Sequence, residues 1–324
     1  MSDGASGVSA NKGGTKQGFV NEENAKSILI YETEKQRANG ALRAVGSARA
    51  YYYNTICDVK DEELPKEYMV KNLSNVLDQG SVNSCVAHGV AGALSANHLK
   101  HTGELLDLSV LLIYGLWRGD MTGMGMFVES TLENGRDIGT SPRTYAPENL
   151  EVPDAISKAK EYAKEYPNAM AFKVGSFYKM RENANFVKDI KKALYQYDLP
   201  LVTVKNGSSR HCELIVGWDK DNFILQNSYG EEWGNKGFHK LSLTTTALDE
   251  TFLVLADKVE LPFSDTEGHW AEKYIRNLYF SGIMEGYPDG TFKPDAPITR
   301  AELAKVVDEV LKDIDDKLKK LDKR

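Results

Sequence analysis

Four side chains between residues 79 and 227 of this chain have the types and spacing needed for nucleophilic chemistry. Cys85 opens a stretch with a helical pattern, and the positive end of a helix dipole favours the thiolate, which is the nucleophilic form. Gln79 precedes it closely enough to present its amide to an oxyanion formed beside the sulfur. His211 and Asn227 follow Cys85 at separations close to the roughly 130–150 residues of one known Cys-His-Asn arrangement.

Together these side chains predict hydrolysis through a covalent acyl-thioester. His211 would hold Cys85 as a thiolate and later protonate the leaving amine. Asn227 would accept a hydrogen bond from the imidazole and fix its tautomer and orientation. The Gln79 amide and the Cys85 backbone N–H would hold the oxyanion, and losing one such donor typically costs ~10²–10³ in rate. We therefore predict a catalytic set of these four residues.

The composition argues against several other classes of protein. A net charge of -7 and an isoelectric point near 5.5 give no basic surface for nucleic acid. No apolar run reaches the ~18 residues of a membrane span, so we expect no such span. Three cysteines are too few for a disulfide framework, and we expect Cys57 and Cys212 to be core residues. The histidines show no metal-type spacing, so we predict neither a metal site nor another cofactor.

The elements that must position these side chains come from the middle of the chain. Helical patterns come first and strand patterns follow, which favours an α+β fold with segregated layers over alternating βαβ units. We expect helices at residues 86–99, 109–117, 126–134, 153–165 and 188–197. We expect strands at residues 201–204, 213–218, 222–226, 237–241 and 252–255.

Residues 63–259, which hold these elements, resemble the papain-like cysteine peptidases. The resemblance rests on three segments, residues 79–87, 211–218 and 226–238, in the family's order. It implies a two-lobed fold, with a helical lobe and an antiparallel, β-barrel-like lobe, acting on peptide or protein substrates. The implied roles are those given above to Cys85, His211, Asn227 and Gln79.

The sequence departs from that family's pattern near the predicted site. Val82 replaces a disulfide cysteine, and Val86 and Tyr229 replace two tryptophans, so we expect a thinner aromatic cover over the His–Asn bond. In the family, a glycine-rich strand pairs with the substrate backbone. Gly123 and Gly125 are the candidates for substrate binding here.

Residues 1–62 form an N-terminal extension. The first 20 residues are rich in Gly, Ser, Lys and Asn, and we expect them to be disordered. Residues 21–50 predict a helix. The extension is either a removable pro-segment that occludes the cleft or a segment packed on the body, and the residues do not decide between the two.

The C-terminal part, residues 262–311, resembles one S-layer homology (SLH) repeat, a small all-α module. In that family such repeats attach proteins to acidic secondary polymers of the bacterial cell wall. The resemblance implies polymer contacts from Arg300 and Trp270, and a guanidinium group can bind a carboxylate bidentately. Thr299 and Glu302 have the spacing of a capping box for the second helix.

Only one repeat is present, whereas these repeats usually occur in threes, and a single repeat cannot bury its own apolar face. Three chains would form a homotrimer through this module, or the repeat would dock on the peptidase body. The charged tail, residues 312–324, continues an apolar 3–4-residue spacing, which slightly favours self-association.

These observations predict a cysteine peptidase, of endo- or exopeptidase type, tethered to the bacterial cell envelope or acting outside the cell. The first residues lack the apolar core of a signal peptide, which leaves an earlier cleavage, non-standard export, release by lysis and transport on a phage particle open. The alternatives are a non-catalytic papain-like envelope scaffold or adhesion protein and an amidase of cell-wall peptides.

Overall fold

The structure of the protein is a computed structural model, and it describes residues 41–42, 51–119, 123–147, 149–207, 209–280 and 283–321. The disorder expected for residues 1–20 and most of the helix expected at 21–50 lie outside these ranges. The two described residues of that second segment form a strand, β1 (Ala41–Leu42), rather than part of a helix.

The first half of the body is helical, as the apolar patterns predict. Its longest helix, α2, is rich in Ala, Val and Gly and is buried on every side for most of its length, and Gly103 ends it in the left-handed conformation at φ 73°. Ser109 caps the next helix by accepting a hydrogen bond from the Leu112 N–H. The helices of this half are α2 (Cys85–Thr102), α3 (Val110–Leu116), α4 (Val128–Gly135) and α5 (Asp154–Glu165).

The second half forms one antiparallel sheet with the strand order β4-β9-β5-β6-β7-β8, and β2 (Tyr68–Met69) pairs with β6. Within the described residues this path ends at β4 and β8, so the antiparallel lobe that we expected is present as an open sheet and does not close into a barrel. Helix α6 (Phe186–Tyr197) precedes the central strands. The strands are β4 (Val174–Lys179), β5 (Leu201–Lys205), β6 (His211–Trp218), β7 (Asn222–Gln226), β8 (Phe238–Ser242) and β9 (Leu248–Ala256).

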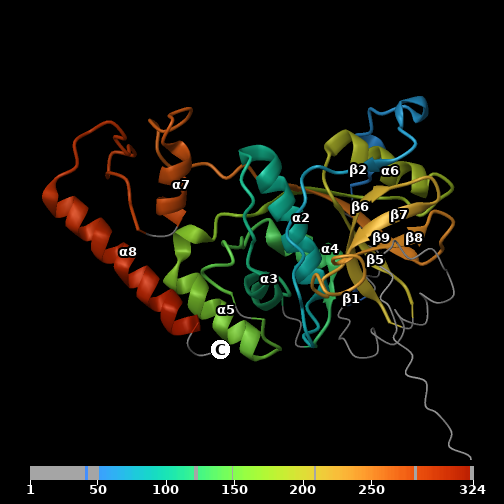
Figure 1. The fold of residues 1–324 in the computed structure, drawn as a ribbon, viewed down its shortest axis with the longest axis horizontal. Coiled ribbons are helices and arrows are strands. Elements are labelled where there is room, and N and C mark those ends of the chain that lie inside the picture. The colour runs from blue at the N-terminus through green and yellow to red at the C-terminus, as the bar shows by residue number, and fades with distance from the viewer. Residues whose placement is uncertain are drawn as a thin grey trace, which may run out of the picture.

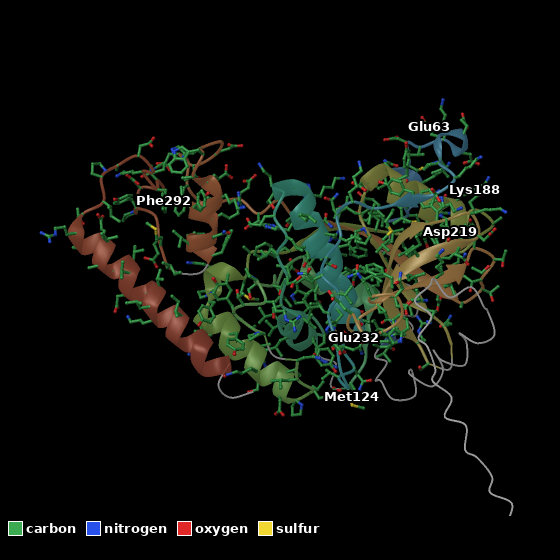
Figure 2. The ribbon with its side chains drawn as sticks, viewed as in Figure 1. Glu63, Met124, Lys188, Asp219, Glu232 and Phe292 are labelled. Carbon is green, nitrogen blue, oxygen red and sulfur yellow. The ribbon has the colours of Figure 1, made fainter. Side chains whose placement is uncertain are left out.

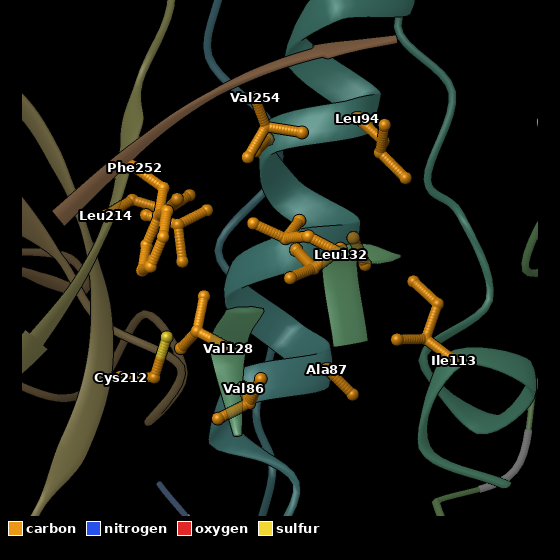
Figure 3. Close-up of a cluster of buried hydrophobic side chains, with 14 of the residues drawn as sticks. Val86, Ala87, Leu94, Ile113, Val128, Leu132, Cys212, Leu214, Phe252 and Val254 are labelled. Carbon is orange, nitrogen blue, oxygen red and sulfur yellow. The ribbon is translucent and has the colours of Figure 1, made fainter. Parts of the chain in front are cut away.

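Helix α2 stands between the sheet and helices α3 and α5 (Figure 1). Figure 3 shows its side chains meeting Cys212, Leu214 and Phe252 of the sheet on one side and Ile113 of α3 on the other. Close approach depends on Gly89, because a Cβ there would lie 2.9 Å from the Cys212 Sγ. Cys212 is therefore a buried packing residue, as predicted. This packing fixes the N-terminus of α2 against the sheet.

Two short strands lie where the sequence patterns indicate other structure. The helix expected at 126–134 begins only at Val128, and the two residues before it form β3 (Met126–Phe127). β3 pairs in parallel with β1, which brings the N-terminal extension onto the body. Tyr53 lies in the 3-10 helix η1 (Tyr53–Thr55), is 1% exposed, and donates a hydrogen bond from its hydroxyl to Gln196 Oε1 at 2.7 Å.

Farther along the extension, Asp61 in η2 (Asp61–Glu63) makes ion pairs with Lys188 and Lys192, each at 2.7 Å. Figure 2 shows Glu63 and Lys188 at the same corner of the molecule. The last dozen residues of the extension are thus packed on the body next to α6.

The C-terminal module contains α7 (Glu272–Phe280) and α8 (Arg300–Leu321), which lie at the end of the molecule away from the sheet (Figure 1). The predicted capping box is present: Thr299 N donates to Glu302 Oε2 at 2.8 Å, and Glu302 N donates to Thr299 Oγ1 at 3.2 Å. Helix α8 continues without a break across the expected boundary between the repeat, which was to end at residue 311, and the charged tail. Among the described residues, no helix is long and apolar enough to cross a membrane.

The module touches the body through α7. The rings of Phe280 and Phe172 lie 5.9 Å apart, Arg276 donates to the Val259 carbonyl, and Lys273 lies 3.6 Å from Glu104. Phe172 adjoins the 3-10 helix η3 (Pro167–Ala169) on the body side.

Candidate active site

Cys85 is the first residue of α2, as predicted, and its side chain is buried. The chain enters the helix through a tight turn in which Gly80 has φ 58°, Ser84 N donates to Val82 O at 2.8 Å, and Ser84 is the N-cap. The first turn of α2 carries no acidic residue. The positive end of the helix dipole therefore faces the sulfur without a competing carboxylate in that turn.

His211 and Asn227 meet because their strands are antiparallel neighbours. Leu214 of β6 pairs with Gln226 of β7, which places residue 227 opposite the start of β6, where His211 lies. The His211 Nε2–H donates to Asn227 Oδ1 at 2.8 Å, and the two residues are only 1% and 3% exposed. This bond occupies Nε2 and leaves Nδ1 for the sulfur, as the predicted roles require.

The pKa of His211 is raised above its ordinary value. Burial acts to lower it, but the hydrogen bond and charge interaction with Cys85, the charge of Glu213 and the hydrogen bond with Asn227 outweigh burial. The site therefore favours an imidazolium beside the sulfur, which is the partner that a thiolate needs. By contrast, burial raises the pKa of the Cys212 thiol, so that cysteine stays protonated.

Gln79 is fully buried and held at both ends of its amide. Its Oε1 accepts a hydrogen bond from Ser228 Oγ at 2.6 Å, and its Nε2 donates to Val82 O at 2.9 Å. Ser228 also donates its backbone N–H to Asn227 Oδ1 at 2.7 Å. Ser228 thus contacts both Gln79, predicted for the oxyanion site, and Asn227, predicted to orient the histidine.

Tyr229, one of the two replacements that we expected to thin the aromatic cover over the His–Asn bond, packs directly on the histidine. The Tyr229 ring stacks on the His211 ring, with centroids 4.7 Å apart and planes 22° apart, and Tyr229 is 1% exposed. Trp233 packs edge-on against Tyr229 at 5.5 Å. A tyrosine shields this bond from water because its neighbours bury it, a property that the residue type alone does not reveal.

The glycine segment lies beside the nucleophile's segment. Asn83 Nδ2 is 3.6 Å from the Met124 Sδ, which connects the residues before Cys85 with the stretch from Gly123 to Gly125. Both glycine carbonyls accept hydrogen bonds from the buried Arg118 guanidinium. Met124 lies at the surface and is 59% exposed (Figure 2).

The residue that the sequence reasoning missed is Glu213. Its side chain is buried and accepts hydrogen bonds from Asn227 Nδ2 and His239 Nε2, each at 3.0 Å. A signal was available, because Glu213 lies two positions after His211 on one strand and therefore on the same face. A charged residue on the same strand face as the histidine predicted to be catalytic is informative.

Comparisons with known proteins agree with this geometry. The family model of papain family cysteine proteases matches residues 155–251. This part of the chain is papain-like. The papain-like body is 26% identical to cathepsin M of Mus musculus over 195 residues, which are 52% of this chain and 56% of that protein. The chain thus spans about half the length of this relative.

Solved structures share the body's fold. Xylellain, a cysteine protease from Xylella fastidiosa, has a TM-score of 0.56 at 17% identity and covers 69% of this chain and 97% of its own. A procathepsin B from Trypanosoma congolense has a TM-score of 0.55 at 15% identity, with coverages of 70% and 89%. These identities are low, so they show the fold alone.

The S-layer homology domain model matches residues 262–304. The cellulosome-anchoring protein of Acetivibrio thermocellus is 47% identical over 53 residues, which are 16% of this chain and 12% of that protein. Both resemblances drawn from the sequence are therefore confirmed: the papain family model matches one part of the chain and the S-layer homology model the part that follows it.

Proposed function

We propose that the papain-like body hydrolyses peptide bonds with Cys85 as nucleophile, His211 as acid and base, and Asn227 as its orienting partner. The observation that carries this proposal is the buried 2.8 Å hydrogen bond from His211 Nε2 to Asn227 Oδ1. Because this bond uses Nε2, the other ring nitrogen, Nδ1, is left to interact with Cys85 at the start of α2. The raised pKa of His211 beside Cys85 supports the same pairing.

The proposed reaction runs in two halves. The thiolate attacks the scissile carbonyl, a C–S bond forms, and the oxyanion is held by the Gln79 amide and the Cys85 N–H. His211 gives its proton to the leaving nitrogen as the C–N bond breaks. Water, deprotonated by His211, then attacks the thioester, and the thiolate leaves with the acid product released.

We propose that substrate lies along the segment from Gly123 to Gly125. Its carbonyl oxygens are hydrogen-bonded inward by Arg118 and, for Met124 O, by the Tyr114 hydroxyl at 2.7 Å. Contacts with substrate would therefore use its backbone N–H groups and the exposed Met124 side chain.

The N-terminal extension supports a further part of the proposal, occlusion of this substrate-binding segment. β1 pairs with β3, directly after the glycine segment, with Ala41 opposite Met126. Ala41 is 5% exposed, so the contact is well covered. Removal of residues 1–50 would uncover this segment, because it would delete β1. Removal of residues 1–62 would also delete Tyr53 from the core.

The second proposed activity is attachment to an acidic cell-wall polymer through Arg300 and Trp270. Trp270 is 78% exposed, and Arg300 is exposed at the start of α8. An exposed ring and a guanidinium group suit a carboxylate-bearing sugar. This attachment would place the protein at the bacterial cell envelope. Sedimentation with purified walls, comparing wild type with Arg300→Ala and Arg300→Lys, tests it.

The apolar side of α8 supports a proposed homotrimer. Leu303, Val307, Leu311 and Ile314 are each about half exposed along one helix (47–59%). Such a stripe is more apolar than an isolated surface helix requires. Sedimentation equilibrium of wild type and Val307→Glu tests the assembly, with a monomeric wild type contradicting it.

The experiment that tests the peptidase is labelling with an epoxide inhibitor of papain-like peptidases. Wild type should be labelled stoichiometrically at Cys85, Cys85→Ala should not be labelled, and Asn227→Ala should react more slowly. Cys212→Ala is the matched control, because that thiol is buried and protonated, and its labelling should equal that of wild type. Absence of labelling in both the full chain and the chain beginning at residue 51 would favour the scaffold alternative.

A further inference from the structure

A fully buried carboxylate lies directly beneath the proposed catalytic pair. Glu213 Oε1 accepts a hydrogen bond from Asn227 Nδ2 at 3.0 Å, and Oε2 accepts one from His239 Nε2 at 3.0 Å. Lys205 Nζ lies 3.5 Å from Oε1, and His211 Nε2 lies 3.8 Å from it. The side chain of Glu213 is 0% exposed. A buried charge that makes these contacts is costly unless its partners are fixed, so its place here calls for a role.

We propose that Glu213 is a positioning residue for the catalytic pair, which orients the Asn227 amide and sets a permanent negative charge beside the His211 imidazolium. The inference rests on the proposed peptidase function and deepens it. Glu213 touches neither substrate nor sulfur in this arrangement and acts through Asn227 and His211.

The orienting effect follows from the donors and acceptors of the amide. An asparagine side chain has nearly the same shape in its two flipped orientations, so packing alone does not choose between them. An ionised carboxylate is only an acceptor, so it must face Nδ2, and this turns Oδ1 toward His211 Nε2. A flipped amide would set its oxygen against the carboxylate and its N–H groups against the imidazole N–H. Glu213 thereby also fixes which histidine nitrogen faces Cys85.

The charge effect requires that Glu213 remain ionised. Burial alone acts to raise its pKa, but the charges of Lys205 and His239, the hydrogen bond from His239 and the charge of His211 outweigh burial and lower it. Its negative charge in turn contributes to the raised pKa of His211.

Other titratable groups around His211 come from three elements. Cys85 on α2 acts in the same direction as Glu213, whereas Lys205 on β5 opposes it by partly neutralising the carboxylate. His88 on α2 stays neutral near pH 7, because burial lowers its pKa to about 4. His239 on β8 donates to the carboxylate. Among these groups, Glu213 is the permanent anion nearest the imidazole.

Two series of contacts connect His239 with His211. One is the polar route through Glu213 and Asn227, and the other is aromatic, through Trp233 (5.3 Å between centroids) and Tyr229. This closed ring of contacts gives the carboxylate and the imidazole partners on both the polar and the aromatic side.

The test is the titration of His211 in the full chain, followed by NMR with ¹³C-labelled histidine. The chain has six histidines, and His211→Gln identifies the relevant signal. In Glu213→Gln we expect the His211 pKa to fall by about one unit or more, because an opposite charge within 4–6 Å typically shifts a pKa by that amount. We also expect kcat to fall with KM little changed.

Lys205→Gln is the sign control, because it disturbs the same buried network but removes the opposing charge, so the His211 pKa should rise. If Glu213→Gln fails to fold, Lys205→Gln alone tests the proposal. An unchanged or lowered His211 pKa in Lys205→Gln then overturns it. An unchanged pKa in Glu213→Gln overturns it as well.

Cys85→Ala separates this inference from the peptidase function itself. If the His211 pKa does not respond to Cys85→Ala and the epoxide does not react, the proposed function fails. If Cys85 is coupled to His211 but Glu213→Gln leaves the His211 pKa unchanged, only the role of Glu213 fails.

Discussion

The papain-like body and the S-layer homology module differ in which side chains they bury and which they expose. In the body, the polar groups Gln79, His211 and Glu213 are almost fully buried, and each has hydrogen-bond partners. In the module, Trp270 and Leu303 are 78% and 50% exposed. Polar groups are buried only where precise partners hold them, and apolar groups are left exposed where another molecule can cover them.

This difference is what we expect if the body carries out its proposed chemistry within one chain and the module binds its proposed partner outside that chain. The predictions below test that division.

The largest contrast should appear in stability. Leu132→Ala, at a fully buried position (Figure 3), should destabilise the chain by about 2–5 kcal/mol, because it removes core contacts and leaves a cavity. Leu303→Ala on α8 should cost less than about 0.5 kcal/mol. Urea denaturation of both variants at low protein concentration measures the difference. An equal loss would mean that Leu303 is buried in solution, and the division would not hold.

Peptide hydrolysis and cell-wall binding should depend on different parts of the chain. Gln79→Ala should lower kcat by ~10²–10³ through loss of an oxyanion donor, and it should leave sedimentation with cell walls unchanged. Arg300→Ala should reduce wall binding and leave peptide hydrolysis unchanged. Both assays are run on both variants. Reduced hydrolysis in Arg300→Ala would show that the module contributes to the active site.

Acid should unfold the body before it affects the module. His88 Nδ1–H donates to the Ser84 carbonyl at 3.0 Å, and burial lowers the His88 pKa from 6.5 to about 4. Because the unfolded chain binds this proton more readily, stability falls as pH drops from about 6.5 to about 4, by roughly 3 kcal/mol.

Denaturation of wild type and His88→Gln across that range checks the acid effect, and the variant should show a flatter dependence. Parallel curves for the two proteins would assign the acid sensitivity to other groups.

The smallest effect concerns the start of α8. Thr299→Ala removes the hydroxyl that accepts the Glu302 N–H and should destabilise this helix by about 1 kcal/mol. Hydrogen exchange in the first turn of α8 should become faster, with exchange in α2 unchanged. Thr299→Ser retains the cap and is the matched control. If slow exchange persists in Thr299→Ala, the helix is held by contacts with another chain instead.

Much of the fold could be predicted because the patterns are local. The apolar runs gave α2, α3, α5 and the strands from β5 to β8 close to their observed bounds, since burial periodicity and capping act over a few residues. The prediction for residues 126–134 placed the start of α4 too early, because Met126 and Phe127 satisfy a strand pairing with distant residues. β4 was missed, because a half-buried strand carries a weak pattern.

The sequence alone indicated the residues of the proposed chemistry and the starts of helices α2 and α8. Cys85 at a helix start, the order of His211 and Asn227, and the capping box at Thr299 all depend on residue type and spacing, which the sequence states directly. The tertiary structure alone decided which groups surround them. Glu213 beneath Asn227, Tyr229 stacked on His211 and the exposed face of α8 depend on contacts between distant segments, and only the packed chain brings those segments together.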